Sequence, residues 1–351
     1  MTKQALNGKI FATAVGSVPY KDVAAACDKI LRNFKEMPFW PQLVKWSFLE
    51  NMYVQFSEKL PGVVVDEKQK KIYVDTSKDF SAAAELLYEK FLGNDPDFFS
   101  ISRQYAEGLY AMLGAVKGAA VKPQFLKGQI TGPVSFGLTV TDEKKQPIFY
   151  NRELREALVK MLSMRAAWQA RKIKETGPEP VIFIDEPYLA SMGSSYISLK
   201  KEDVFSALEE IAQALHKEGA LCGIHCCGNT DWGFILGTSI DIVNFDAYSF
   251  YEAVLLYPKE LSGFIDRGGI LAWGIIPNTK DIFDETADKL ISRIKGALAA
   301  FENKGIGIKK VLNAMLVTPS CGMGLLDEKA ADCVMERSAE VAERLNSGKA
   351  F

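Results

Sequence analysis

Short apolar runs alternate with longer amphipathic segments along most of the chain. The apolar runs are rich in Ile, Val, Leu and Phe, which is typical of parallel strands buried on both faces. They lie at Ile10–Val15, Gln124–Ile130, Val181–Asp185, Leu221–Cys226, Asp241–Asp246, Gly269–Gly274 and Val311–Val317. The amphipathic segments predict helices at Asn151–Glu175, Lys201–Lys217, Asp284–Asn303 and Glu328–Asn346. Strands and helices that alternate at this spacing indicate parallel β-α-β units.

This alternation predicts an α/β fold, namely a single (β/α)8 TIM-type barrel over residues 1–351. Seven strands are visible, and Pro41–Lys45 is the candidate for the eighth. A doubly wound open sheet is the alternative, but no GxGxxG or GxxxxGK[ST] motif follows any strand candidate. Two β-branched runs flank a charged turn within residues 62–75, and they predict a small β-hairpin insertion near the N-terminus.

The composition narrows the range of partners. The chain has 351 residues, of which 48% are hydrophobic and 25% charged, and its formal net charge is −2. Because there is no basic excess to neutralise phosphates, nucleic acid and anionic membrane surfaces are not expected partners. No segment has the apolar length of a signal-peptide core or a transmembrane helix, so a cytoplasmic location is expected.

The cysteines point to metal chemistry. Six cysteines make a poor disulfide framework for so long a chain, and clustered thiols in a reducing compartment more often bind metal. Cys222, Cys226 and Cys227 surround His225, one of only two histidines. Side chains alternate along a strand, so His225 and Cys227 are expected to project the same way and Cys226 the opposite way. Cys321 follows the last strand and reaches the same rim of the barrel, where active sites lie.

One imidazole and two thiolates form a known catalytic set for Zn²⁺, with a fourth position open to water or substrate. His225, Cys227 and Cys321 are therefore predicted to bind one zinc ion, and a packed core histidine among buried thiols is the alternative. Asp246 ends the next strand. It is a candidate fourth ligand or a hydrogen-bond partner of the ligating imidazole, and a helix N-cap is its alternative role.

Two further clusters lie at predicted strand ends. Asp185 and Glu186 close an apolar strand, where adjacent carboxylates suit a cation such as a substrate ammonium group. A solvated turn is the alternative. Val15, Gly16 and Ser17 end the first strand. Gly16 permits close backbone approach, and the amide and hydroxyl of Ser17 are candidates to hold a substrate carboxylate.

The order of these motifs resembles the zinc-dependent C-terminal catalytic barrel of cobalamin-independent methionine synthase, within the uroporphyrinogen decarboxylase-like superfamily. The matching motifs are Val15-Gly16-Ser17-x-Pro19, Thr131-Gly132-Pro133, Asp185-Glu186-Pro187, His225-x-Cys227 and Pro319-x-Cys321-Gly322. The resemblance implies that His225, Cys227 and Cys321 hold zinc.

The resemblance also assigns roles to the acidic residues. Asp246 stands where the family has a glutamate ligand to zinc. Asp185, the catalytic-site carboxylate, would bind the homocysteine amino group, and the turn from Val15 to Ser17 would bind its carboxylate. Glu50 is the nearest candidate for the family's second amino-binding glutamate.

The expected function is an S-methyltransferase that activates homocysteine as a zinc-bound thiolate and methylates it to methionine. The segment His225-Cys-Cys-Gly228-Asn229 also resembles the HxCGN signature of methylcorrinoid:coenzyme M methyltransferases. The methyl donor is therefore open between a methylcorrinoid protein or methylcobalamin and methyltetrahydrofolate. Two alternatives stand beside this function: methyl transfer to another thiol such as coenzyme M, and a non-catalytic zinc or corrinoid partner protein. Asp185 favours homocysteine, because coenzyme M has no ammonium group.

Overall fold

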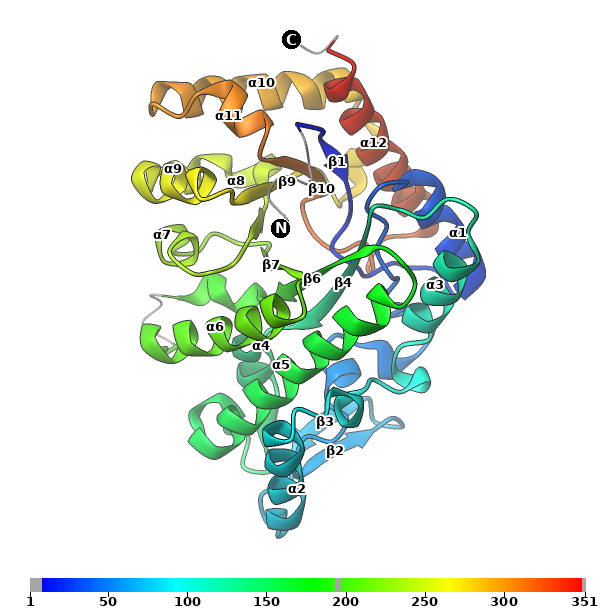
Figure 1. The fold of residues 1–351 in the computed structure, drawn as a ribbon, viewed down its shortest axis with the longest axis vertical. Helices are drawn as coiled ribbons and strands as arrows, with labels where there is room; N and C mark the ends of the chain where they lie inside the picture. Colours follow the sequence, from blue (N-terminus) through cyan, green and yellow to red (C-terminus); the bar gives the residue numbers. More distant parts are fainter. Residues whose placement is uncertain (1–7, 193–196, 349–351) are drawn as a thin grey trace.

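The computed structural model describes residues 8–192 and 197–348. Its main sheet has seven strands, all parallel, in the order β1-β10-β9-β8-β7-β6-β4. The strands are β1 (Phe11–Ala12), β4 (Phe125–Thr131), β6 (Glu179–Asp185), β7 (Leu221–Cys226), β8 (Ile242–Phe245), β9 (Ile270–Ile276) and β10 (Met315–Pro319). The spatial order follows the chain from β4 to β10 and then returns to β1, so the sheet curls toward a barrel (Figure 1).

Helices connect the strands and flank the sheet on several sides (Figure 1). The α-helices are α1 (Val23–Asn33), α2 (Ser81–Leu92), α3 (Glu107–Gly118), α4 (Pro133–Thr139), α5 (Arg152–Lys174), α6 (Lys201–Lys217), α7 (Trp232–Leu236), α8 (Ala247–Val254), α9 (Pro258–Asp266), α10 (Ala287–Asn303), α11 (Ile308–Leu312) and α12 (Glu328–Asn346). Short 3-10 turns are η1 (Phe48–Glu50), η2 (Val54–Phe56), η3 (Pro96–Phe99), η4 (Arg103–Tyr105), η5 (Ile148–Tyr150), η6 (Pro187–Ser191) and η7 (Lys280–Phe283).

Each of the seven apolar runs contains a strand and each predicted helix is present, and α6 and α12 have the predicted bounds. The last strand departs most from its predicted bounds. The run at Val311–Val317 was expected to be strand throughout, but its first residues belong to α11 and the strand begins at Met315. Ile308 and Val311 are three residues apart, which is helical spacing, and Val311 is buried on that helical face.

The predicted eighth strand at Pro41–Lys45 does not form. The chain there makes single bridges instead, with the Gln42 amide donating to Gly16 O at 3.0 Å and the Trp40 amide donating to Lys127 O at 3.1 Å. These bridges contact the turn at Gly16 and Ser17, which follows β1, on one side and β4 on the other. Pro38 and Pro41 lack an amide hydrogen, so a continuous ladder cannot run through this segment. The parallel α/β prediction is confirmed, whereas a regular eight-stranded barrel is not seen in the described residues.

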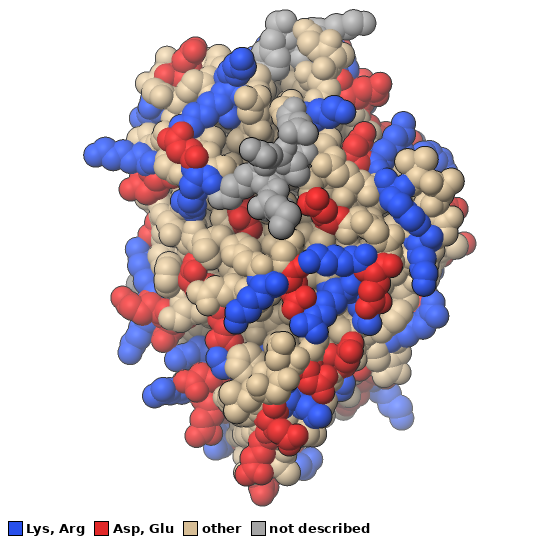
Figure 2. Space-filling view, viewed as in Figure 1, with Lys and Arg blue, Asp and Glu red and all other residues tan. Residues whose placement is uncertain are grey.

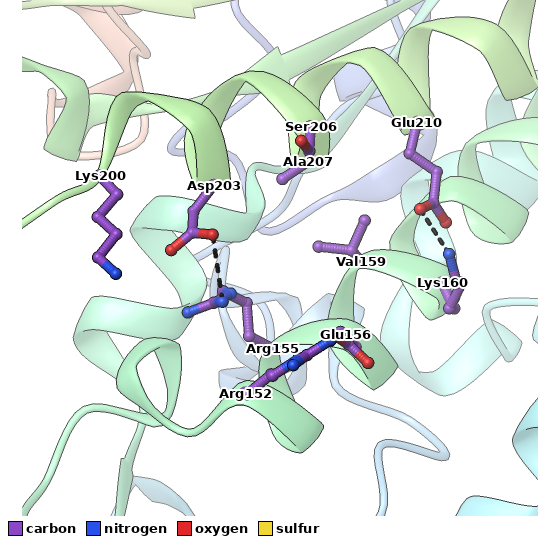
Figure 3. Close-up of a pocket in the computed structure, with 10 residues that line it drawn as sticks. All are labelled: Arg152, Arg155, Glu156, Val159, Lys160, Lys200, Asp203, Ser206, Ala207 and Glu210. Carbon is purple, nitrogen blue, oxygen red and sulfur yellow. Dashed lines mark hydrogen bonds and ion pairs between the residues drawn. The ribbon is translucent and has the colours of Figure 1, made fainter.

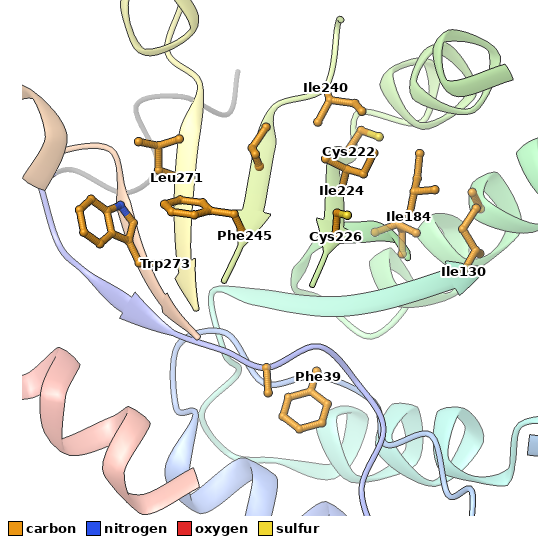
Figure 4. Close-up of a cluster of buried hydrophobic side chains, with 14 of the residues drawn as sticks. Phe39, Ile130, Ile184, Cys222, Ile224, Cys226, Ile240, Phe245, Leu271 and Trp273 are labelled. Carbon is orange, nitrogen blue, oxygen red and sulfur yellow. The ribbon is translucent and has the colours of Figure 1, made fainter. Parts of the chain in front are cut away.

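The sheet buries both of its faces. The outer face packs against the helices, and Figure 4 shows Cys222, Ile224 and Cys226 lying together on that side of β7. The inner face carries a separate apolar layer contributed by successive strands, including Phe125, Phe183 and Leu221. The layer fills the interior below the ends of the strands. It leaves the carboxyl ends of the strands for polar side chains.

The predicted hairpin is confirmed. β2 (Val63–Asp66) and β3 (Lys71–Val74) pair antiparallel, and β5 (Thr141–Asp142) adds a parallel strand beside β3. This small sheet lies with α2 at one end of the molecule (Figure 1).

The surface carries mixed charge. Figure 2 shows Lys and Arg interspersed with Asp and Glu over the visible face, as the net charge of −2 leads one to expect. Among the helices that the structure describes, none is long and apolar enough to cross a membrane.

Candidate metal centre

His225, Cys227 and Cys321 converge at the carboxyl end of the sheet. Their ligand atoms all lie within 4.8 Å of one another, and within residues 8–192 and 197–348 they form the one such group of His, Cys and acidic side chains. His225 is near the end of β7, Cys227 directly follows that strand, and Cys321 follows β10. The three predicted ligands are therefore brought together.

Strand alternation explains which cysteine joins the group. His225 faces the interior of the curled sheet and is 3% exposed, whereas Cys226 points to the outer face and is 1% exposed. The Cys226 thiol donates to Gly228 O at 3.5 Å, and burial raises its pKa to about 12. Cys226 is thus a packed thiol, as the alternation predicted, and Cys227 takes the position beside His225.

Asn244 fixes the tautomer of His225. Its Oδ1 lies 2.6 Å from His225 Nδ1, while its Nδ2 donates to Ala272 O and to Thr318 Oγ1, each at 2.8 Å. Because both hydrogens of the Asn244 amide nitrogen are donated elsewhere, the atom that faces His225 is the oxygen Oδ1, which accepts, so Nδ1 of His225 carries a proton. In the neutral imidazole the lone pair is then on Nε2. Nε2 is buried without a hydrogen-bond partner, which suits a metal ligand in this position.

The two sulfurs form a coupled pair. A hydrogen bond from Cys321, with a further contribution from His225, lowers the pKa of Cys227 to about 4. The pKa of Cys321 is raised, first because its thiol hydrogen-bonds to Cys227 and then because it is buried. Of the two sulfurs, Cys227 is therefore the one that gives up its proton more readily. Two sulfurs beside an imidazole nitrogen are a donor set typical of Zn²⁺, so the residues present fit that ion.

A cavity of about 340 Å³ opens over this group. Val15, Ser17 and Asp185, three of the predicted substrate-binding residues, line it together with the three ligands. Much of the remaining wall is apolar, formed by Val44, Met52, Pro187 and Leu325. None of the described residues that line it is a lysine or an arginine. The cavity therefore combines a metal-binding set, one free carboxylate and an apolar wall.

Asp185 is the ionisable group of the cavity outside the ligand set. Its Oδ1 is buried and has no hydrogen-bond partner. Burial raises the pKa of Asp185 to about 6, and the nearby Lys127 and His225 oppose that rise. A buried acceptor without a partner is costly in a folded protein, so this oxygen is suited to a donor that arrives with a ligand.

Lys127 is a functional candidate that the sequence analysis missed. It lies on β4, is fully buried, and its Nζ donates to Val15 O and contacts Gln129 Oε1 at 3.3 Å. Nζ also lies 4.7 Å from the Phe183 ring centroid. Burial lowers the pKa of Lys127 to about 8, against the attraction of Asp185. A lysine within a strand that begins with the apolar pair Phe125-Leu126 was the signal that could have revealed it.

The turn after β1 packs tightly against its neighbours. Gly16 has φ +146°, and a Cβ there would lie 2.6 Å from the Gln129 side chain, so only glycine fits. Ser17 Oγ accepts from the Gly324 amide at 3.3 Å. A Cβ on Gly322 would lie 2.2 Å from Ser17 Oγ. The turn from Val15 to Ser17 and the loop that carries Cys321 are therefore in direct contact.

Glu186 does not line the cavity. Its carboxylate accepts from the Val134 and Ser135 amides at 2.8 Å each, at the N-terminus of α4. A Cβ on Gly132 would lie 2.1 Å from Glu186 Cδ, which accounts for the glycine of the Thr131-Gly132-Pro133 motif. Burial raises the pKa of Glu186 to about 7, although these amides oppose the rise. The two carboxylates predicted to act together thus point to different places.

Glu50 and Asp246 also lie outside the cavity wall. Glu50 is fully buried and accepts from the Leu43 amide at 2.5 Å and the Gly108 amide at 3.4 Å. It thus holds together two segments of backbone. Asp246 accepts from the Ser249 amide at 2.9 Å and caps α8, which is the alternative role considered for it. Of the predicted site residues, these two and Glu186 are engaged with backbone amides.

A second hollow lies between α5 and α6 and shares no lining residue with the cavity over the metal-binding group. It measures about 450 Å³, and Figure 3 shows the charged side chains that line it. Arg155 pairs with Asp203 at 3.4 Å and Lys160 with Glu210 at 2.6 Å. Its described lining contains no thiol or imidazole, and most of its charges neutralise one another. It offers a solvated ion-pair network and no catalytic set.

Comparison with known proteins supports the fold. No protein-family model and no curated protein matches the sequence. Among solved structures, the chain resembles a B12-independent methionine synthase from Shewanella sp. W3-18-1 in complex with selenomethionine. The TM-score is 0.57 at 14% sequence identity, and the match covers 97% of this chain and 99% of that chain. At such identity the likeness concerns the fold alone, and the predicted resemblance to the fold of a cobalamin-independent methionine synthase is confirmed.

Proposed function

We propose that this chain is a zinc-dependent S-methyltransferase that methylates homocysteine to methionine. The observation that carries the proposal is the convergence of one imidazole and two thiols on a cavity that Asp185 also lines, with its Oδ1 buried and without a hydrogen-bond partner. The fold shared with a methionine synthase supports it. A metal set beside a site for an ammonium group suits an amino acid whose side chain ends in a thiol.

His225, Cys227 and Cys321 would hold the zinc ion, and a set of three protein ligands leaves a position for substrate. When bound, Zn²⁺ acts as a Lewis acid that keeps a thiol deprotonated at neutral pH. The chain's contribution is to present its donors in the correct state. Asn244 holds a proton of His225 on Nδ1, so Nε2 would be the nitrogen that binds the ion.

Asp185 would bind the substrate ammonium group, which supplies the donor that Oδ1 lacks. Lys127 lies behind this carboxylate and favours its charged form. The turn from Val15 to Ser17 lies on the same cavity and would receive the substrate carboxylate. An amino acid held at both groups presents its sulfur in a fixed place, and such positioning supplies much of the rate enhancement.

The apolar wall of the cavity would keep water from the reacting sulfur. Val44, Met52 and Leu325 contribute to it. In the transfer, the sulfur lone pair forms the new bond to the methyl carbon, and the electron pair of the old bond leaves with the donor. The donor is a methylcorrinoid protein, methylcobalamin or methyltetrahydrofolate. No general base is required of the chain, because a thiol bound to the ion would release its proton to solvent before the methyl group moves.

Methyl transfer to coenzyme M is the second candidate, and the cavity disfavours it. A sulfonate thiol has no ammonium group for Asp185, and the described cavity wall has no lysine or arginine for the sulfonate. With that ligand Asp185 would stay buried without a donor and would repel the anion.

The test is product formation by zinc-loaded protein. Homocysteine and coenzyme M are each supplied with methylcobalamin or with methyltetrahydrofolate, and the methylated thiols are measured. We expect methionine from at least one donor and no methylated coenzyme M. Cys321→Ser should abolish the activity, and Cys226→Ser, which alters the neighbouring packed thiol, is the matched control. Methylation of coenzyme M in preference to homocysteine would refute the proposal.

A further inference from the structure

The loop that carries Cys321 leaves the sheet before it reaches the metal-binding group. The pairing of β10 with β9 is irregular between Thr318 and Pro319, and the last ladder contact is the Ser320 amide donating to Ile276 O at 2.8 Å. Beyond this point no strand partner holds the backbone of Cys321. His225, in contrast, lies within β7 and is held by both neighbouring strands. The backbone of His225 is therefore held by the sheet, whereas the backbone of Cys321 depends on contacts of its loop.

Asn278 spans Cys321 from the adjacent loop. It follows β9, and its side-chain Oδ1 accepts from Ser320 Oγ at 2.9 Å. Its Nδ2 donates to Gly322 O at 3.1 Å. Its own backbone amide lies 3.4 Å from Ser320 Oγ. One amide side chain thus holds the residue before Cys321 and the residue after it.

Contacts on the far side of the loop hold a different stretch. The Met323 amide donates to Ser17 O at 2.9 Å, and the Gly324 amide donates to Ser17 Oγ at 3.3 Å. These contacts begin two residues after Cys321. Asn278 is the side chain that fixes the residues directly beside it.

We infer that Asn278 is a positioning residue for the metal centre: by bridging Ser320 and Gly322 it holds the Cys321 sulfur toward His225 and Cys227. Without the bridge, the loop can rotate about Ser320 and carry the sulfur away from the other two ligands. Residues that orient metal ligands through hydrogen bonds typically change metal affinity about 10- to 100-fold when they are removed. The inference rests on the metal centre of the proposed function, but it concerns metal retention and not the methyl transfer.

The two ends of the Asn278 side chain can be separated by mutation. Asn278→Ala removes both contacts. Asn278→Asp keeps an acceptor for Ser320 Oγ but places a carboxylate against the Gly322 carbonyl, so it loses the second contact and adds repulsion. Ser320→Ala removes the first contact and leaves the second. Thr279→Ala is the matched control, because the hydroxyl of Thr279 bonds to Asp281 within its own loop.

The measurement is the zinc dissociation constant of each full-length variant, obtained by competition with a chelator. We expect about 10- to 100-fold weaker binding for Asn278→Ala and Asn278→Asp, a smaller loss for Ser320→Ala and no change for Thr279→Ala. Thermal melting of the chelator-treated proteins controls for folding. Cobalt substitution adds a reading that a purely structural role would not change. The thiolate-to-cobalt absorption should fall toward that of a single thiolate in Asn278→Ala.

The possible results distinguish a failure of the role given to Asn278 from a failure of the proposed metal centre. Zinc binding by Asn278→Ala within about twofold of the wild type, with an unchanged cobalt spectrum, would overturn the inference and leave the proposed function intact. A wild-type chain that binds no zinc would overturn both. If Asn278→Ala does not fold, Ser320→Ala decides, since it removes one contact at a single hydroxyl, and wild-type affinity in that variant would refute the bridge.

Discussion

Two replacements of Asn244 distinguish its effect on the tautomer of the predicted ligand His225 from its effect on the stability of the sheet. Asn244 is fully buried and makes three hydrogen bonds, one of them to the Nδ1 of His225 at 2.6 Å. Asn244→Leu has nearly the same volume and removes all three. Asn244→Asp keeps the acceptor for His225 and loses the two donated bonds. The comparison of these variants isolates the contribution of the imidazole contact.

The magnitudes follow from what each variant leaves without a partner. In Asn244→Leu, the Nδ1 hydrogen of His225 and the hydroxyl of Thr318 are buried without partners, at a cost of about 1–3 kcal/mol each. The imidazole is also free to adopt the other tautomer, so zinc should bind about 10- to 100-fold more weakly. Asn244→Asp should lose stability through the Ala272 carbonyl, which then faces a carboxylate. Its zinc affinity should stay near that of the wild type, because an acceptor still faces Nδ1.

Three measurements test this reasoning. Competition with a chelator gives the zinc affinity, and thermal melting of the metal-free proteins gives the stability. The chain has only two histidines, so long-range ¹H–¹⁵N spectra can identify the tautomer of His225 directly. The wild type should show the proton on Nδ1. Zinc affinity that is equal in Asn244→Leu and the wild type would refute the role given to Asn244, as would a wild-type proton on Nε2.

The other predictions concern individual residues of the site and its surroundings. Cys321→Ser should lose most of the zinc seen by metal analysis, whereas Cys226→Ser should retain about one zinc per chain; full retention in Cys321→Ser would contradict the ligand assignment. Asp185→Asn should raise the KM for homocysteine about 10- to 100-fold with zinc content unchanged. The reason is that it removes a charge-assisted hydrogen bond worth about 1.5–3 kcal/mol. An unchanged KM would exclude Asp185 from ammonium binding. The pKa of Glu186 is about 7, above its ordinary value, so the stability it contributes is complete below about pH 4.5 and is lost as the pH rises through 7. Denaturant titrations of metal-free protein should therefore show a fall on the order of 3 kcal/mol across that range, and a smaller fall in Glu186→Gln; equal slopes in the two proteins would contradict the raised pKa.

The metal centre was predictable because it depends on local periodicity and strand order. Alternation along one strand selects Cys227 over Cys226, and the return of the last strand to the same rim brings in Cys321. The absence of an eighth strand was also predictable from the sequence, since Pro38 and Pro41 interrupt any ladder of backbone hydrogen bonds.

The roles of the other polar residues depend on contacts between distant segments, and no local pattern reveals these. Glu186 follows Asp185 directly, yet it serves the N-terminus of α4, which comes from an earlier part of the chain. Asn244 and Asp246 lie on the same strand end, and the sequence drew attention to the carboxylate. The structure instead gives the contact with His225 to Asn244, because its register on β8 puts it beside that ligand.

The central claim is that the metal centre receives a substrate sulfur. X-ray absorption at the zinc edge counts the sulfur atoms bound to the ion. The zinc-loaded protein alone should show two sulfur ligands, from Cys227 and Cys321. Addition of homocysteine should raise the number to three, with release of about one proton per zinc. A count that stays at two with saturating homocysteine would contradict the account.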